Sequence, residues 1–350
     1  MKIIAIGDIH ASGFGEDSLV DNLPARLTYI KRSLDYILKH GLEHNIKEYV
    51  MLGDLIHDKT IIYNIAQSML YEFFKNSAEK GCNFTIISGN HDLSSTGQNQ
   101  KSAIEVFDSL PNVTCVVKSP RVTPIGLFVP YTNTFLEDLK KMRGCDCNII
   151  YAHVGLNEAV LQSGLSKVDK LKINDLNDFK LAILGHYHKP QHLFNDIINV
   201  YYAGSLIPKD WNDKNEKKRF LVVDTETLEV ESVEFPESLG IPMYIELVIP
   251  PNQTMENIKI MLKLADDYRK RGHHVRVINR NKTKIKDEVE DIIILEQQQI
   301  DFTNRGITVD QSKLDQCKKY LEIKEIPESE RDNYIKILQD TKLLEVIEGG

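Results

Sequence analysis

The sequence has few cysteines, no long apolar run and no excess of basic charge. Its five cysteines among 350 residues are odd in number and scattered, which argues against a disulfide framework and favours a reducing cytoplasm. No apolar stretch approaches the roughly 18 residues that a membrane span needs, so no membrane partner is expected. The N-terminus, MKIIAIGDIH, meets charge too early for a signal peptide.

Global charge does not indicate a nucleic-acid-binding protein, because the formal net charge is −8. A site for nucleic acid would therefore have to be local, or depend on metal ions or on a partner. The chain is also long for a single hydrophobic core, which favours two domains.

The first ninety residues alternate between strand and helix patterns. Three short apolar runs, KIIAIGD, YVMLGD and FTIISGN, are separated by residues 22–44 and 61–80, which have helical apolar spacing. Strands separated by helices pair in parallel with right-handed crossovers. Later strand patterns follow with few helices, so we expect a second sheet packed on the first in a layered α/β core. These patterns cover 113–117, 148–153, 181–188, 199–205 and 219–225.

A domain boundary is predicted within PESLGIPMYIEL, residues 236–247, where two prolines and a glycine interrupt the chain. The remainder reads as a small α+β domain. We therefore predict a catalytic domain over 1–235, a second domain over 241–312 and C-terminal helices over 313–350.

Five predicted strand ends carry side chains that can bind metal ions or move protons. In an α/β sheet, ligands gather just outside the carboxyl ends of the strands, so these side chains are expected to converge. Within Asp8-Ile-His10 and His186-Tyr-His188, residues two apart point the same way on an extended segment. The five segments are Asp8-Ile-His10, Gly53-Asp54-Leu-Ile-His57, Gly89-Asn90-His91-Asp92, His153 and Gly185-His186-Tyr-His188.

The donor types indicate a centre with two divalent metal ions. Imidazole with carboxylate and amide oxygens suits Mn, Fe or Zn rather than Ca. Two ions about 3.5–4 Å apart polarise a phosphate and lower the pKa of a bridging water, which gives hydroxide at neutral pH. Taken singly, a Gly-Asp or Gly-His after a strand is more often a turn or a helix cap. All five segments together, in a chain with 11 histidines, favour the metal centre.

In this order the segments resemble the calcineurin-like metallophosphoesterase superfamily. Within it, GHYHKPQHL and YYAGSLIPKDWND are similar to segments of SbcD-type nuclease subunits of SbcC–SbcD complexes. One departure is Ala11-Ser12, where that branch usually continues Leu-Gly. The resemblance covers about 1–235 and implies a four-layer sandwich of two packed mixed β-sheets flanked by helices. It also implies a smaller C-terminal α+β capping domain.

The resemblance also implies a role for each site residue. Metal 1 would be held by Asp8, His10, Asp54 and His188, and metal 2 by Asp54, Asn90, His153 and His186, with Mn²⁺ favoured and Mg²⁺, Fe²⁺ or Zn²⁺ as alternatives. His91 would protonate the leaving sugar oxygen or hold the phosphate, and His57 would position the phosphate. Asp92 would orient His91, although a helix cap is an equal alternative for it. For His57 the alternative is a rim histidine without a catalytic role.

The implied function is a Mn-dependent DNA exonuclease or endonuclease that hydrolyses phosphodiesters through a hydroxide held by two metals. It would act with an SbcC-type, SMC-like ATPase in DNA end processing, repair, recombination or replication, as a homodimer formed through the first helices. Two alternatives share the resemblance. One is a stand-alone enzyme acting on a small phosphodiester or a phosphoprotein, and the other is a scaffold without catalysis, against which the intact ligand set speaks.

A local run of basic residues near the C-terminus is a candidate DNA-phosphate surface. The alternative is a solvated face balanced by the acidic run that follows it. Two amphipathic segments in the last forty residues are interpreted as helices packing on the second domain or, by analogy, as a docking helix for the ATPase. The basic residues are Arg269, Lys270, Arg271, Arg276, Arg280, Lys282, Lys284 and Lys286.

Overall fold

A computed structural model gives the structure of residues 1–13, 19–94, 101–160, 171–281, 285, 292–296, 318 and 331. The described chain divides into two compact units, one made of Met1–Ile245 with Tyr268–His274 and the other of Glu246–Asp267 with the described residues from Val275 onward. The three domain ranges stay predictions. Nearly all of the predicted 313–350 segment lies outside the described residues.

The first sheet has four parallel strands at its centre, because buried apolar strands alternate with covering helices. The strand order is β14-β13-β1-β4-β5-β6, with β13 antiparallel to β1 and β14 antiparallel to β13. The parallel strands are β1 (Lys2–Ile6), β4 (Glu48–Met51), β5 (Asn83–Ile87) and β6 (Val113–Val116), and the other two are β13 (Arg219–Asp224) and β14 (Val230–Glu234).

The second sheet repeats this plan with parallel strands flanked by antiparallel edge strands. Its order is β11-β12-β10-β9-β8-β7. The parallel strands are β8 (Gly126–Val129), β9 (Ile149–His153), β10 (Leu181–Gly185) and β12 (Asn199–Tyr202). The edge strands are β7 (Arg121–Thr123) and β11 (Gln191–Phe194).

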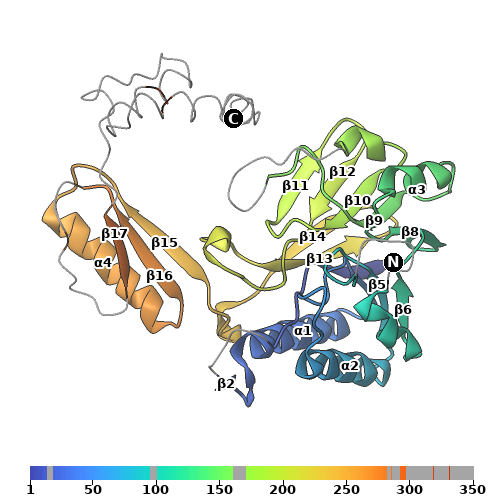
Figure 1. The fold of residues 1–350 in the computed structure, drawn as a ribbon, viewed down its shortest axis with the longest axis horizontal. Coiled ribbons are helices and arrows are strands. Elements are labelled where there is room, and N and C mark those ends of the chain that lie inside the picture. Colours follow the sequence, from blue (N-terminus) through green and yellow to red (C-terminus); the bar gives the residue numbers. More distant parts are fainter. Residues whose placement is uncertain are drawn as a thin grey trace. The chain divides into compact units, whose positions relative to one another are not determined.

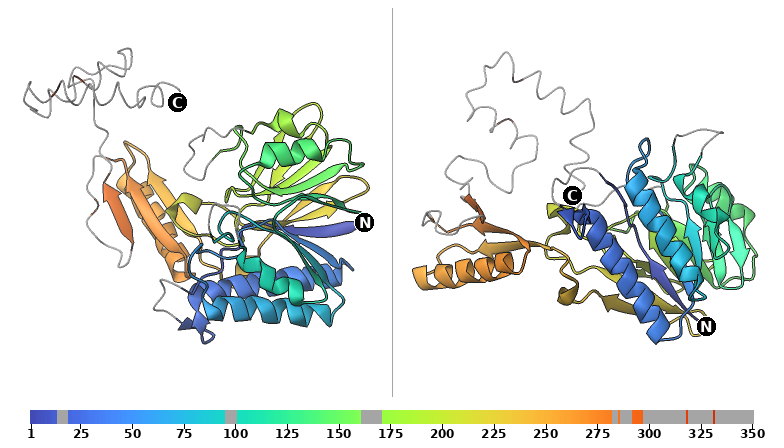
Figure 2. Two further views of the ribbon diagram at one scale, coloured as in Figure 1. Left: turned by 45° about the vertical axis from the view of Figure 1, so that its right-hand side comes forward. Right: turned by 90° about the horizontal axis from the view of Figure 1, so that it is seen from below.

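The two sheets pack face to face between helices, which confirms the four-layer sandwich (Figures 1 and 2). Side chains such as Ile3, Val50 and Tyr151 form the apolar layer between the sheets. On the outer face of the first sheet lie α1 (Ala25–Glu43) and α2 (Asn64–Ala78), and α3 (Phe135–Lys141) covers the second sheet.

The remaining elements of the first unit are short. They are the hairpin β2 (Leu19–Val20) and β3 (Leu23–Pro24), and the 3₁₀ turns η1 (Ala103–Ser109), η2 (Ile173–Leu176), η3 (Trp211–Asp213) and η4 (Glu237–Leu239). Across the described residues, no helix is both long enough and apolar enough to cross a membrane.

The second unit is built on a three-stranded sheet and one helix. Its sheet order is β15-β16-β17, and β16 and β17 are parallel. The elements are β15 (Tyr244–Ile249), α4 (Met255–Lys270), β16 (His274–Asn279) and β17 (Ile293–Glu296). The helix buries Ile258, Leu262 and Ala265, which recur at helical spacing and form its apolar stripe.

Two local features differ from simple sequence reasoning. The α1 helix runs through Gly41 to Glu43, and Gly41 is needed for packing, since a Cβ there would lie 1.9 Å from the Tyr49 hydroxyl. The short helix α3 and the edge strands β7, β11 and β14 were not expected. They are brief or partly exposed, so their apolar periodicity is weak.

Candidate metal centre

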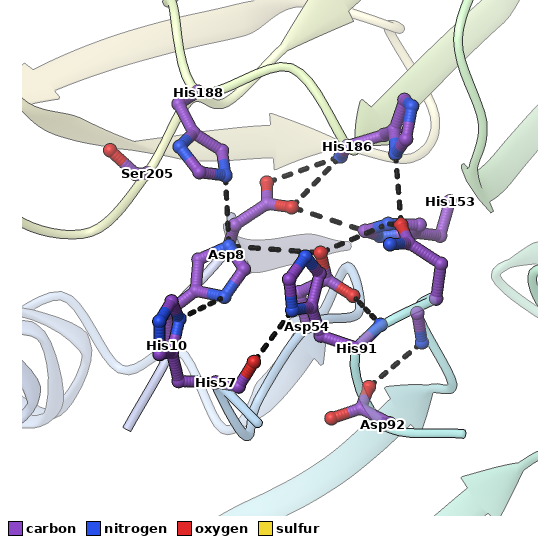
Figure 3. Close-up of polar contacts among 12 residues, drawn as sticks. Asp8, His10, Asp54, His57, His91, Asp92, His153, His186, His188 and Ser205 are labelled. Atoms are coloured by element: carbon purple, nitrogen blue, oxygen red, sulfur yellow. Dashed lines mark hydrogen bonds and ion pairs between the residues drawn. The ribbon is translucent and has the colours of Figure 1, made fainter. Parts of the chain in front are cut away.

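The predicted ligands come together at one edge of the sandwich. In the first sheet β1, β4 and β5 are parallel neighbours, and in the second sheet β9 and β10 are parallel neighbours. Each of these strands ends at, or just before, one of the five segments. Figure 3 shows their side chains pointing toward a common centre, although they come from residues 8 to 188.

Three of the seven predicted ligands sit on backbone in the left-handed region. The φ angles are 50° at His10, 50° at Asp54 and 98° at His186. Such conformations are uncommon outside glycine and cluster at functional sites. Gly53, with φ 96°, allows His153 to approach, because a Cβ on it would lie 2.3 Å from His153 Nδ1.

One half of the centre is formed by Asp8, His10, Asp54 and His188. The Nε2 atoms of His10 and His188 are 2.8 Å apart, and His10 Nε2 lies 3.7 Å from Asp54 Oδ2. Ligand atoms of Asp8, His10 and His188 all lie within 4.8 Å of one another. Asp8 also accepts a hydrogen bond from the His186 main-chain N–H at 3.0 Å, which ties the two sheets together at the site.

The other half gathers Asn90, His153 and His186 beside Asp54. Asn90 Oδ1 lies 3.0 Å from both His153 Nε2 and His186 Nδ1. His153 Nε2 is 3.5 Å from Asp54 Oδ2. The opposite ring nitrogen, Nδ1, donates to the Leu52 carbonyl oxygen at 2.7 Å, so Nε2 is the nitrogen that faces the centre.

The buried carboxyl and imidazole groups hold unusual charge states in the absence of a cation. Burial raises the pKa of the Asp8 carboxyl to about 7, helped by the nearby charge of Asp54. Burial alone would lower the pKa of His153, but the carboxylates of Asp54 and Asp8 raise it to about 9. For Asp54, burial is outweighed by His153 and His10, which hold its pKa below the usual range. A proton on His153 thus balances carboxylate charge where a metal ion would otherwise do so.

Two other imidazoles at the centre are neutral. Burial lowers the pKa of His10 well below its usual value and lowers that of His188 to about 4. Neutral imidazole is the form that binds metal ions. Two neutral rings whose Nε2 atoms face each other at 2.8 Å, beside two carboxylates, therefore fit a cation between them.

The three residues predicted for catalysis surround this centre in different ways. His91 Nδ1 donates to the main-chain oxygen of His57 at 2.6 Å, and the two rings stack with centroids 5.7 Å apart. His57 Nδ1 lies 3.5 Å from His10 Nδ1. Asp92 is buried and accepts from the main-chain N–H groups of Ile56 and Gly89, at 2.9 and 2.8 Å. The His91 ring is therefore oriented by the His57 carbonyl oxygen rather than by the predicted Asp92.

Sequence reasoning missed two groups that contact the ligands. The Tyr131 ring stacks on His186, with centroids 6.4 Å apart, and meets His153 edge-on. Tyr131 follows β8, a parallel neighbour of β9, so the same strand-end argument would have found it. Lys218 Nζ donates to the His188 carbonyl oxygen at 3.1 Å, and nothing in its sequence context signals this.

The predicted basic run is only partly described. Arg271 lies over the Tyr268 ring and pairs with Glu237 at 2.9 Å, and Arg276 pairs with Glu246. Arg269, Lys270 and Arg280 also have interactions of their own. Lys282, Lys284 and Lys286 lie outside the described residues.

A groove of about 590 Å³ at the carboxyl end of β6 carries further basic side chains. Lys101, Lys118 and Arg121 line it and are exposed, together with the acidic Glu105 and Asp108. Since β6 is the parallel neighbour of β5, the groove opens at the same edge of the sheet as the Asn90 loop.

A model of the family described as calcineurin-like phosphoesterase matches residues 1–190, more than half of the chain. The chain belongs to this family. The match spans all seven predicted ligands, from Asp8 to His188, and confirms the resemblance seen in the sequence. Metallophosphoesterases use divalent metal ions, and the clustered His and Asp side chains form a site that can hold them.

Two relatives of this phosphoesterase are nuclease subunits by name. It is 25% identical over 305 residues to exonuclease subunit 1 of Enterobacteria phage T4, covering 84% of this chain and 82% of the relative. It is 21% identical over 254 residues to the SbcD subunit of nuclease SbcCD from Escherichia coli strain K12, covering 60% of this chain and 62% of the relative.

Solved structures of similar proteins include TT1561 of Thermus thermophilus and a hypothetical protein of Pyrococcus horikoshii. The first is 11% identical, covers 67% of this chain and 98% of its own, and has a TM-score of 0.43. The second is 15% identical, covers 76% and 93%, and has a TM-score of 0.40. Because both scores are below 0.5, the fold is assigned from the family match and the sheet topology.

Proposed function

We propose that this phosphoesterase is a metal-dependent DNA nuclease subunit that works with an ATPase partner. The observation that carries the proposal is the convergence of seven nitrogen and oxygen ligands at the carboxyl ends of five strands. The names of the two relatives, both nuclease subunits, support DNA as the substrate and a partner subunit.

The ligand set fits a pair of divalent ions. Asp8, His10 and His188 would hold one ion, with Asn90, His153 and His186 holding the other and Asp54 shared between them. The absence of sulfur donors and the mixture of imidazole, carboxylate and amide oxygen favour Mn²⁺, with Mg²⁺, Fe²⁺ or Zn²⁺ as alternatives. When bound, two such ions polarise the phosphate and lower the pKa of a water molecule.

His91 is the proposed proton donor to the leaving oxygen. Its Nδ1 is engaged by the His57 carbonyl oxygen, which leaves Nε2 for the substrate. A proton on Nε2 passes to the sugar oxygen as its bond to phosphorus breaks and water adds to phosphorus. His57 stacks on this ring and approaches His10, so it fixes the ring plane and supports a metal ligand.

The site assignment is tested by comparing Asn90→Ala with His91→Ala. The first variant should lose Mn²⁺ binding and Mn²⁺-dependent cleavage of linear duplex DNA. The second should lose about 10²–10⁴-fold in cleavage, the usual contribution of general acid catalysis, while still binding Mn²⁺ and DNA. Asn174→Ala, at a distant loop, is the matched control. Robust cleavage by Asn90→Ala would defeat the assignment.

The substrate is tested with Mn²⁺ by comparing linear duplex DNA with a small chromogenic phosphodiester and a phosphopeptide. A DNA nuclease should prefer DNA by a wide margin in kcat/KM. A preference for the small phosphodiester or the phosphopeptide would instead support a stand-alone enzyme acting on those substrates.

Two basic surfaces are candidates for holding DNA phosphates. One is the groove lined by Lys101, Lys118 and Arg121, and the other is the C-terminal run, in which Arg271 and Arg276 already have acidic partners. Each lost phosphate contact lowers the slope of log affinity against log salt by about 0.9. Lys118→Ala with Arg121→Ala should therefore flatten the slope more than Arg271→Ala does, and an equal slope would exclude the groove.

The remaining parts of the proposal concern the cellular setting. The ATPase partner, the homodimer and roles in repair, recombination or replication are supported by the kinship with the SbcD subunit of nuclease SbcCD. The described cysteines are unpaired, which suits a reducing cytoplasm. Copurification of an SMC-like ATPase with the full chain is the direct test of the partner.

A further inference from the structure

A buried lysine lies directly behind one of the predicted metal ligands. The Lys218 side chain is only 3% exposed. Its Nζ donates to Asp213 Oδ1 at 2.7 Å, to Glu216 Oε2 at 2.6 Å and to the His188 carbonyl oxygen at 3.1 Å. All three protons of the ammonium group are thus used. Burying an ammonium group is costly even when it is paired, so its position beside His188 calls for a role.

The Lys218 contact fixes the peptide group that follows His188. The His188 carbonyl oxygen accepts a second hydrogen bond, from the Ser205 main-chain N–H at 3.0 Å. With two donors on one oxygen, the backbone at His188 has little freedom, and its ring is held against His10 at 2.8 Å. Metal ligands have to be held to within about 0.5 Å of their productive position, so such backbone support matters.

The neighbouring ligand His186 does not depend on Lys218. Its main-chain N–H donates to Asp8, and its Nδ1 lies 3.0 Å from Asn90 Oδ1. It also directly follows β10, whose last residue, Gly185, is paired with His153. Loss of the lysine contact should therefore disturb the half of the centre that contains His188 and leave the half that contains His186 intact.

Asp213 extends this support to the neighbouring turn. Its second oxygen, Oδ2, accepts from the main-chain N–H of Lys209 at 2.7 Å. The Lys209 carbonyl oxygen in turn accepts from the Tyr244 hydroxyl at 3.1 Å. The buried pair thus has two functions to separate, holding this turn in the fold and positioning the His188 ring.

We propose that Lys218, held by Asp213 and Glu216, is a positioning residue for the metal ion bound through His188. The proposal rests on the proposed two-metal function. It makes a selective statement about one of the two ions, which a purely structural ion pair would not make.

The test is a Mn²⁺ titration of the full chain by calorimetry, with electron paramagnetic resonance to count bound ions. Wild-type protein should bind two ions. Lys218→Met should keep one ion at wild-type affinity and weaken the other at least tenfold. Lys217→Met is the matched control, since Lys217 is exposed and pairs with Glu234, and both ions should bind to it normally.

A second variant guards against a folding defect in Lys218→Met, which leaves the Asp213 carboxylate buried without its cation. Asp213→Asn with Lys218→Met removes both charges, a change that folded proteins often tolerate. It still lacks the donor to His188 and should show the same selective loss of one ion.

Two results would overturn the proposal. In the first, a folded variant binds both ions normally and only its melting temperature falls, so Lys218 is merely structural. In the second, both ions weaken equally, so the whole centre has loosened. A wild-type chain that binds fewer than two ions would instead refute the two-metal function, and the order of measurements keeps these failures apart.

Discussion

Manganese affinity should depend steeply on pH, because a metal ion has to displace protons from its ligands. In the metal-free centre the pKa of His153 is raised to about 9 and that of Asp8 to about 7. Both groups lie fully out of solvent. At pH 6 both hold their protons, whereas at pH 8 Asp8 is largely ionised and His153 still protonated. Affinity therefore falls as the pH falls through this window.

The size of the effect follows from the two values. Between pH 8 and pH 6, competition by a proton with a pKa of 9 weakens binding about 90-fold, and one with a pKa of 7 about 10-fold. Together the product of the two binding constants should fall about 900-fold, or about 4 kcal/mol. With ordinary pKa values for His and Asp, the fall would be only about 4-fold, or about 0.8 kcal/mol.

Calorimetric titration of Mn²⁺ at pH 6, 7 and 8, in buffers with different ionisation enthalpies, measures both affinity and protons released. We expect between one and two protons to be released near pH 7 for the two ions together. His44→Ala, which removes an exposed histidine far from the centre in sequence, should leave the curve unchanged. A total change below about tenfold would refute the charge states derived for Asp8 and His153.

Three further outcomes are expected. Gly53→Ala should abolish Mn²⁺ binding, because its Cβ would meet a ligand ring 2.3 Å away, whereas Gly81→Ala, with φ 70° and nothing within 4 Å, should bind Mn²⁺ normally in the same titration. Asp92→Asn should lose about 1–3 kcal/mol in urea unfolding, since one of two buried N–H groups loses its acceptor; an unchanged midpoint would contradict this. Tyr131→Ala should weaken the ion bound through His186, while Tyr131→Phe keeps the stacked ring and should not; equal losses would show that the hydroxyl matters instead.

Much of the fold and the set of site residues could be predicted because both depend on simple periodic patterns. Runs such as Lys2–Ile6 and Asn83–Ile87 are short and apolar and end abruptly in polar residues. Parallel strands bring such ends to one edge whatever their distance in sequence, so Asp8 and His188 meet. The second sheet was expected for the same reason, but its edge strands were not, because they have little apolar signal.

The contacts that orient the side chains could not be predicted, since many of them involve the main chain. His91 is oriented by the His57 carbonyl oxygen, and His153 by that of Leu52. Every residue carries such an oxygen, so the sequence does not distinguish the ones that are used. Asp92 was expected to orient His91, but its oxygens bind two main-chain N–H groups instead.

The charge states at the centre show most clearly where sequence reasoning stops. Asp8 and Asp54 are the same residue type, each follows a glycine at the end of a parallel strand, and both are buried. Yet the pKa of Asp8 is raised to about 7, and that of Asp54 is lowered. The difference arises because Asp54 lies among His153, His10 and His91, whereas burial dominates at Asp8 and the charge of Asp54 adds to it. Asp54 is thus the permanent anion that attracts cations, and Asp8 is the ligand that has to release a proton, which is why affinity should fall in acid.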